Sequence, residues 1–443
     1  MTKTILLTIS IICSASIKLI AQETEWFVLN DAGGSINAIG IEPDALGNVF
    51  TFGNYTGESR FNSADSLGPS TVAYASPNWK HNYIQKVNAL GQLEFVCHIK
   101  TKGSNMDYAE IRKMKVLPNG NVAFYLYTKY GFEIQDASKT IHTFRSNQKS
   151  FLLILSNDGS VIKAKELPLT KCVAMDVRGS ELLLLGEPQR YVSYNQHLWS
   201  IDFDGNQLVV LSDNMNGVRD IHFYNDKLWL LHYVQLSKQR YNTSDGYFLS
   251  YMGIDNVRKT ISSDTIAFGL ARSTSPSLIV RKNQIELAVL VQNAGKLVCN
   301  NIEYPAYNLE TGLFTFNTNS KLTGNTLLNT RTRNIEIHGT NDGGIIVNSL
   351  VYDSLIVGKK FVMKAPKHND YIYESVFFKL DKNLKFEWFV NGGGSSSVYA
   401  TTSFCVVNRN VCISSILYDY IDLSSDRRFV NWKMGSYVWS INY

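Results

Sequence analysis

Short runs in which apolar and polar residues alternate follow one another along the chain, separated by turns rich in Gly, Asn and Asp. Ile335-Glu-Ile-His338 is a typical run. Alternation with a period of two predicts β-strands, because successive side chains of a strand point to opposite faces of its sheet. No long stretch shows the 3.6-residue period of an amphipathic helix. The pattern therefore predicts an all-β protein.

A pair of strands joined by a tight turn recurs seven times. The second strand of each pair starts at intervals of 46 to 73 residues, which is the spacing of propeller blades that carry insertions. The second strands begin at Asn48, Asn121, Glu181, Lys227, Gln284, Gly344 and Asn410. The first strands are expected at 36–41, 111–117, 172–177, 218–224, 277–281, 334–338 and 400–407.

In the first six repeats an insertion of variable length follows this pair, and then a hairpin with Gly, Asn or Asp at its turn. The seventh repeat offers only one hairpin strand, at 436–443. Its missing partner lies at the other end of the chain, because Glu25-Trp26-Phe-Val28 matches Glu387-Trp388-Phe-Val390 of the sixth repeat. We therefore predict a single seven-bladed β-propeller of four-stranded blades, whose last blade is closed by the N-terminal strand.

The first repeat carries a distinctive set of residues: Trp26, Gly33-Gly34, Asp44, Gly47-Asn48-Val-Phe-Thr-Phe-Gly53 and Gly57. It resembles the SBBP-type β-propeller repeats of secreted bacterial proteins, often from Bacteroidetes. The resemblance implies a propeller and a location in the envelope or outside the cell. It implies no catalytic residues, because the repeated motif is structural.

Residues 1–21 are expected to be a cleaved signal peptide, which leaves 22–443 as the propeller domain. Lys3 precedes an apolar run at 5–12, and Ala21 ends a cleavage signal. Ile12 before Cys13 argues against a lipid anchor, and the apolar run is too short to span a bilayer. We expect an exported protein, in the periplasm or at the cell surface, with no transmembrane segment after cleavage.

Composition narrows the choice of function. A formal net charge of +5 over 443 residues is too small to favour nucleic acid as a partner. The cysteines other than Cys13 are odd in number and scattered, so they do not form a disulfide scaffold. Cys405 and Cys412 would face each other across a turn at 408–409, either bridged or as small buried side chains. No Cys and His spacing indicates a metal site, and we expect no cofactor.

The insertions between the second and third strands should emerge on one face of a propeller, around the end of its channel. Long loops of this kind are often functional, and aromatic and Arg side chains often anchor binding surfaces. The candidate binding residues are Trp79, Lys80, His81, Tyr130, Phe132, Phe144, Arg145, Arg240, Tyr241, Lys360, Phe361, Arg427, Arg428 and Trp432.

No motif assigns a catalytic residue. We therefore expect a non-enzymatic propeller that binds a macromolecule, foremost a protein of an envelope or secretion assembly. A propeller that binds carbohydrate is the alternative, followed by a glycan-active hydrolase or lyase. The latter would need two carboxyl groups at one spot, and no spacing in the sequence selects such a pair.

Overall fold

The structure is a computed structural model, and it describes most of the chain that follows the N-terminal segment. The residues described are 24–64, 68–75, 80–101, 109–145, 149–188, 196–213, 215–235, 245–253, 260–261, 277–281, 284–290, 295–299, 302–306, 310–317, 322–329, 336–351, 354–358, 360–364, 374–391, 403–417, 420–424, 427–430 and 435–442. The expected signal peptide at 1–21 lies outside these residues.

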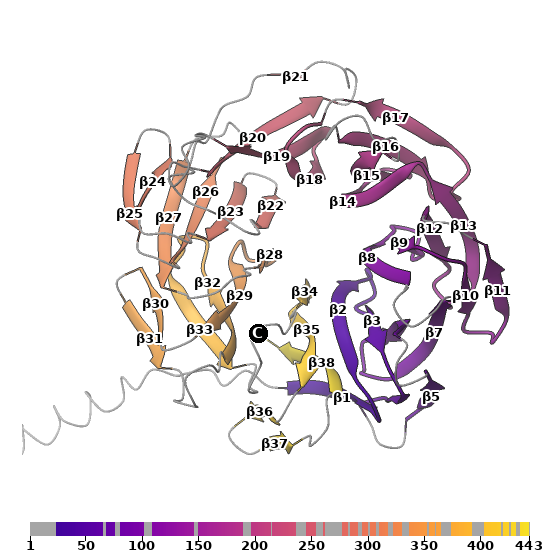
Figure 1. Cartoon of the computed structure of the whole chain (residues 1–443). Coiled ribbons are helices and arrows are strands. Elements are labelled where there is room, and N and C mark those ends of the chain that lie inside the picture. Colours follow the sequence, from indigo (N-terminus) through magenta and orange to yellow (C-terminus); the bar gives the residue numbers. More distant parts are fainter. Residues whose placement is uncertain are drawn as a thin grey trace, which may run out of the picture.

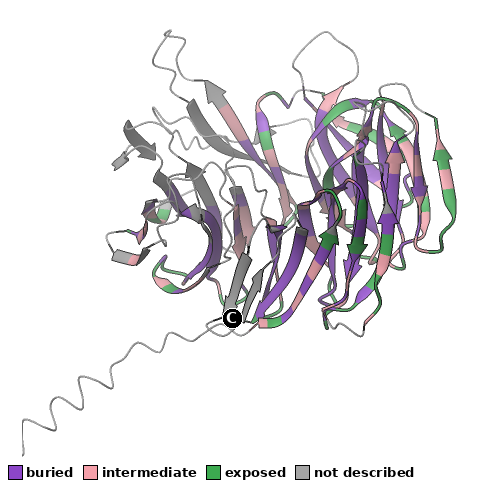
Figure 2. Cartoon of the chain, turned by 60° about the horizontal axis from the view of Figure 1, so that its bottom comes forward, coloured by how far each residue is buried: buried purple, intermediate pink, exposed green. Residues whose placement is uncertain are grey.

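All the described elements are β-strands, numbered β1 to β38, and every pairing among them is antiparallel. The all-β prediction is therefore confirmed. Figure 1 shows the sheets arranged one after another around a common centre, in the order of the sequence. Figure 2 shows that buried residues follow the strands, while many exposed ones lie at the turns and on the outer strands.

The repeated unit of the sequence appears as four consecutively paired strands. The first six units are β2 (Ile36–Pro43), β3 (Val49–Tyr55), β6 (His81–Val87) and β7 (Leu93–Thr101); β8 (Ala109–Val116), β9 (Val122–Thr128), β12 (Lys149–Leu155) and β13 (Val161–Leu167); β14 (Leu169–Arg178), β15 (Glu181–Pro188), β16 (His197–Asp202) and β17 (Leu208–Ser212); β18 (Val218–Tyr224), β19 (Lys227–Gln235), β20 (Asp245–Gly253) and β21 (Thr260–Ile261); β22 (Ser277–Arg281), β23 (Gln284–Leu290), β26 (Glu310–Phe316) and β27 (Leu322–Asn329); and β28 (Glu336–Gly339), β29 (Ile345–Val351), β32 (Glu374–Leu380) and β33 (Phe386–Asn391).

The first and last parts of the chain share one sheet. β34 (Ser403–Val407), β35 (Asn410–Leu417) and β38 (Gly435–Asn442) are followed in it by β1 (Thr24–Ala32). β1 runs along β38 in a register that places Val28 opposite Val438 and Asn30 opposite Ser436. The predicted pairing of the N-terminal strand with the last strand of the chain is confirmed.

The innermost strand of each unit lies beside the innermost strand of the next. This neighbour relation runs through β2, β8, β14, β18, β22, β28 and β34, and β34 in turn lies beside β2. Apolar side chains fill the space between successive sheets. Phe50 and Phe52 of the first unit, for example, share a core with Phe124 and Leu153 of the second.

The insertion hairpins that the structure describes do not collect around the centre, contrary to expectation. β4 (Glu58–Phe61) and β5 (Thr71–Tyr74) extend the sheet of β1, β10 (Phe132–Gln135) and β11 (Ile141–Phe144) extend β7, and β30 (Ser354–Val357) and β31 (Lys360–Lys364) extend β27. β24 (Gly295–Cys299) with β25 (Ile302–Ala306), and β36 (Tyr420–Ser424) with β37 (Arg427–Val430), form small separate sheets. In three cases the hairpin of one unit thus pairs with the outermost strand of the preceding unit, because an unpaired strand edge has free backbone groups to satisfy.

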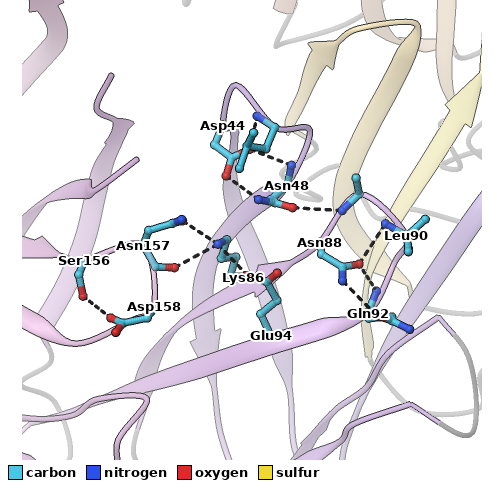
Figure 3. Close-up of polar contacts among 12 residues, drawn as sticks. Asp44, Asn48, Lys86, Asn88, Leu90, Gln92, Glu94, Ser156, Asn157 and Asp158 are labelled. Carbon is cyan, nitrogen blue, oxygen red and sulfur yellow. Dashed lines mark hydrogen bonds and ion pairs between the residues drawn. The ribbon is translucent and has the colours of Figure 1, made fainter. Parts of the chain in front are cut away.

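The Gly, Asn and Asp residues of the repeat are turn residues. Asp44 Oδ1 accepts hydrogen bonds from the backbone nitrogens of Leu46 and Asn48, each at 2.9 Å, and Gly47 has a φ of 88° (Figure 3). Lys86 links two neighbouring units, since its Nζ lies 2.7 Å from Glu94 Oε2 and 2.6 Å from Asn157 Oδ1. These polar contacts close turns and join neighbouring units, which are structural roles.

Candidate functional site

A groove of about 860 Å³ lies between the hairpin strand β5 and the outermost strand of the first unit, β7. Both strands lie at the outer rim of the molecule (Figure 1). We call this groove the rim groove. It exists because β4 and β5 belong to the sheet of β1, while β7 belongs to the next sheet, so the two edges meet without pairing. The lining residues come from β3, from 69–73, from 93–100, from 135–139 and from 158–160.

One wall of the rim groove is a strand edge that pairs with no other described strand. β5 pairs only with β4, and the nitrogen of Ala75 donates to the oxygen of Gly57 at 2.9 Å. Hydrogen-bonded and non-hydrogen-bonded residues alternate along an antiparallel pair. Ala73 therefore directs its backbone groups at β4, whereas Val72 directs its N–H and C=O at the open edge. The Val72 side chain is 52% exposed.

The floor of the rim groove is the face of β7 that packs towards the hairpin β4–β5, where Val96 shares a core cluster with Ala73. Phe95, Cys97 and Ile99 pack into the core shared with the second unit, and the alternating residues Val96 and His98 line the groove. β10 covers β7 only from His98 onward, where Gln135 lies opposite it. The groove therefore runs along the same edge of β7 to which β10 adds a strand, over the part that β10 leaves unpaired.

His98 ends an aromatic cluster beneath this floor. Its Nδ1 lies 3.2 Å from the hydroxyl of Tyr55, and its ring lies 5.8 Å from those of Tyr55 and Phe61. Burial, with the positive charge of Lys100 and the nearby His81, lowers the pKa of His98 to about 4. At neutral pH the imidazole is therefore uncharged, so Tyr55 can donate its hydroxyl proton to Nδ1.

The opposite wall is the turn between β10 and β11. Asp136 is buried and accepts hydrogen bonds from Ser138 Oγ at 2.7 Å and from the nitrogen of Thr140 at 3.0 Å, and His142 Nε2 lies 2.9 Å from its Oδ2. Burial acts to raise the pKa of Asp136, but these hydrogen bonds outweigh it and lower the pKa. The Asp136 carboxylate is used in hydrogen bonds within the turn. The side chains of this wall that a ligand could contact are therefore those of Ser138 and Lys139, which are exposed.

Three of the residues predicted for a binding face belong to the interior. Phe132 is 0% exposed and stacks on Phe144 at 4.9 Å, and both pack near Phe151. His81 is 6% exposed and starts β6. The prediction of a binding role is wrong for Phe132 and His81, and Phe144 is half-buried in the same cluster. The physical reason for Phe132 and Phe144 is the hairpin itself, because a strand that extends a sheet points alternate side chains at its two faces, and one face here packs on Phe151 of β12.

Lys80, Tyr130 and Arg145 are at the surface but do not line the groove. Lys80 and Arg145 are exposed, and Tyr130 is 40% exposed with the Lys129 Nζ 5.9 Å from its ring centre. Lys360 and Phe361 lie on β31, and Arg427 and Arg428 lie on β37, which belongs to a separate sheet. Trp79, Arg240, Tyr241 and Trp432 lie outside the described residues.

A second group of charged side chains lies on the innermost strands β8, β14 and β18. Lys115 Nζ is 3.5 Å from Asp176 Oδ1, and Asp176 Oδ2 accepts the nitrogen of Phe223 at 2.5 Å. The charge of Glu42 raises the pKa of Lys115, against the opposing effect of burial and with further help from Asp176. Asp176 therefore ties three neighbouring strands together, which is a structural task.

The described residues contain no group of three or more His, Cys, Asp or Glu arranged to hold a metal ion. Within the same ranges no helix has the length and apolar character to cross a bilayer. Cys405 and Cys412 lie opposite each other as predicted, and both are buried and free.

Sequence reasoning missed the groove residues Val72, His98 and Gln135. For Gln135 the available signal was the alternation of Phe132-Glu-Ile-Gln135 inside an insertion, which marks this run as a strand that needs a partner edge.

Comparison with known proteins adds little to this geometry. No protein-family model and no curated protein matches the chain. Among solved structures, it is similar to the WD40 domain of SCAP from fission yeast (11% identity, 94% of this chain and 98% of that chain, TM-score 0.40). It is also similar to the GH43_1 enzyme from Xanthomonas citri complexed with xylose (9%, 59% and 85%, TM-score 0.32). A third match is the subtype N11 neuraminidase-like protein of A/flat-faced bat/Peru/033/2010 (H18N11) (6%, 72% and 84%, TM-score 0.34). At TM-scores below 0.5 these likenesses carry no argument about function.

Proposed function

We propose that the mature chain is a seven-bladed β-propeller that acts without catalysis and binds an extended segment of a partner protein in the rim groove. Two observations support the propeller. Seven innermost strands follow one another as neighbours, and β1 supplies the fourth strand of the sheet that begins with β34. A ring built in this way leaves its outer strands and their extensions as the variable part of the surface.

The observation that carries the binding proposal is the open edge of β5 along one wall of the groove. An extended peptide can add to such an edge, with main-chain hydrogen bonds giving affinity and side-chain pockets giving specificity. Val72 offers its N–H and C=O to the incoming strand, and the floor below is apolar at Val96 and polar at His98. A volume of about 860 Å³ also matches the size of ligand pockets in general, roughly 300 to 1,000 Å³.

The location is argued from the sequence, and the class of partner from the location. The N-terminal segment and the resemblance of the first repeat to SBBP repeats support export. The partner would then be a protein of the cell envelope or surface. Carbohydrate binding is the alternative, because the groove also presents the hydroxyl and amide groups of Ser138 and Gln135.

A backbone substitution on β5 tests the proposal. Short random peptides displayed on phage would be selected against the mature chain, and the affinity of the enriched peptides would be measured by fluorescence anisotropy. V72P removes an N–H that points at the open edge and leaves the bonds to β4 intact, so peptide affinity should fall roughly tenfold. V72T changes the side chain alone and is the matched control, which should retain the affinity.

Two results would refute the proposal. One is peptide binding that is the same in V72P and in the unaltered chain. The other is a selection that enriches no peptide while a glycan array retains the protein, which would establish the carbohydrate alternative. Far-ultraviolet circular dichroism of V72P, unchanged from the parent, shows that the sheet is intact.

A further inference from the structure

Two turns of the first unit carry exposed leucines at their tips. The turn between β2 and β3 reads Asp44-Ala-Leu-Gly47, and the turn between β6 and β7 reads Asn88-Ala-Leu-Gly91. In each turn the nitrogen of the fourth residue donates to the oxygen of the first, at 3.2 Å and 2.9 Å. Leu46 is 74% exposed and Leu90 is 75% exposed, more than any other large apolar side chain among the described residues. We call these two turns the leucine turns.

The turn itself does not require leucine at this place. Six other turns of the described residues have the same closing hydrogen bond and a positive φ at their fourth residue. Their third residue, in the place of Leu46 and Leu90, is always polar: Asn119, Ser138, Asp158, Asp204, Asp342 and Asn383. The leucines therefore add nothing to turn formation that a polar residue would not, and they are available for contact with another surface.

The leucine turns touch each other and a neighbouring turn. Asn48 Oδ1 accepts the nitrogen of Ala89 at 3.3 Å, which joins the two turns (Figure 3). A Cβ placed on Gly47 would lie 3.5 Å from Ala89 Cβ and 3.5 Å from Nδ2 of Asn408, in the turn between β34 and β35. The next residue of that turn, Arg409, is exposed. The two leucines and this arginine thus belong to one continuous surface.

A second exposed cation borders the same surface. Asn341 Nδ2 donates to the main-chain oxygen of Asn408 at 3.3 Å, so the turn between β28 and β29 adjoins the turn of Arg409. A Cβ placed on Gly343 of that turn would lie 3.7 Å from the Cβ of Lys382, which is exposed. Among the described residues neither Lys382 nor Arg409 forms an ion pair.

The carboxylates near these cations each have a partner within the protein, so they do not cancel the positive charge. The pairs are Glu25 with Asn410 and Ser440, Glu42 with the charge of Lys115, Asp44 with the nitrogens of its own turn, Asp342 with Lys379, and Asp381 with the nitrogens of Asn383 and Lys385.

We propose that this surface, formed by the leucine turns with Arg409 and Lys382, docks on a bilayer that contains anionic lipid. Apolar side chains enter the boundary between head groups and acyl chains, while cations attract anionic head groups. Tips that project from tight turns suit such a deformable surface, whereas the anchors of a protein partner usually fill pockets.

The place where the chain enters the ring supports a bilayer as the occupant. Glu25, at the start of β1, bonds to Asn410 directly after the turn that carries Arg409. An N-terminal segment held in the membrane during export would therefore bring this side of the ring next to the bilayer. Two leucines and two cations give weak, reversible docking, because stable anchoring needs more buried apolar surface. The proposal is independent of the rim groove.

Flotation of the mature chain with vesicles tests the proposal. The chain should float with vesicles of equal parts phosphatidylglycerol and phosphatidylethanolamine, and far less with phosphatidylcholine vesicles. L46S combined with L90S should weaken this binding roughly tenfold or more. V209S combined with V210S is the matched control, because it removes two apolar side chains that are 52% and 53% exposed on the outer strand β17.

A charge substitution tests the second part of the surface. R409Q combined with K382Q should weaken binding to the anionic vesicles roughly tenfold. K149Q combined with K171Q makes the same change in net charge and should leave binding unaltered, because these lysines lie at the ends of β12 and β14 remote from the turns. Unchanged midpoints of urea unfolding show that the variants are folded.

Four results would overturn the proposal. They are the absence of vesicle binding, binding that survives L46S with L90S, equal binding to anionic and phosphatidylcholine vesicles, and self-association that L46S with L90S abolishes while no vesicle is bound. The last result would make a second copy of the chain the occupant. V72P, which tests the rim groove, should float like the unaltered chain, so the two proposals can fail separately.

Discussion

Replacing His98 by Phe should reduce the free energy of unfolding that the protein loses when the pH falls from 8 to 5. His98 is 7% exposed and faces Tyr55 from β3 and His81 from β6, with Lys100 two residues along its own strand and Glu133 opposite Lys100. Burial, Lys100 and His81 lower its pKa to about 4, and burial with Lys100 lowers that of His81 to about 4 as well. In the unfolded chain both histidines titrate near 6.5.

The size of the effect follows from these values. Between these two pKa values each histidine binds a proton in the unfolded chain but not in the folded one. The free energy of unfolding therefore falls as the pH falls from about 6.5 towards 4. Between pH 8 and pH 5 the loss is about 2 kcal/mol for each, or about 4 kcal/mol for His98 and His81 together. H98F should therefore lose only about half of that amount, with a constant cost of about 1 kcal/mol at every pH for the missing bond to Tyr55.

Urea unfolding followed by tryptophan fluorescence at a series of pH values measures this slope. K100Q is an internal check on the cause, because removing the positive charge should raise the pKa of both histidines and reduce the acid loss. If H98F and the unaltered chain lose the same free energy between pH 8 and pH 5, His98 is not held neutral in the folded protein and the reasoning fails.

Three further experiments test other parts of the structure. V28D puts a carboxylate at a position that is 0% exposed in β1 and should cost at least about 3 kcal/mol in urea unfolding, whereas a loosely attached N-terminal strand would tolerate it. F132A should cost about 3 to 5 kcal/mol and Y130A less than about 1 kcal/mol, and the reverse order would restore Phe132 to the surface. Cys405 and Cys412 are free and buried, and burial raises the pKa of Cys405, so both thiols should resist alkylation until the chain is denatured; rapid labelling of the native protein would contradict this.

The strands were predictable because their signals are local. Asp44, Gly47 and Asn48 form a turn that is closed by their own side chains and backbone, so neighbours in sequence suffice to recognise it. The partner of β38 was also predictable, since Trp26 and Trp388 mark equivalent strands of two repeats. The order of the strands within a unit follows from such signals alone.

The position of the insertions was not predictable in the same way. Phe132 and Phe144 stand beside polar residues in sequence, and this pattern is compatible both with a surface loop and with a hairpin. Their burial depends on β10 pairing with β7, an edge that belongs to the preceding unit. Which edge is open is a property of the assembled sheets. The rim groove arises from the same cause, because β5 joins one sheet and β7 another.

The closing strand shows how such a long-range pairing can still be specific. Asn30 of β1 is 1% exposed, and its Nδ2 lies 2.9 Å from Gln85 Oε1 and 3.3 Å from Ser436 Oγ, while its Oδ1 accepts the nitrogen of Asn62 at 3.3 Å. A slip of one residue along β38 would turn every side chain of β1 to the other face. Val28 would then leave the core and the polar groups around Asn30 would stay buried without partners, at about 1 to 3 kcal/mol each. Apolar burial holds the two ends of the chain together, and this polar network selects the register in which they meet.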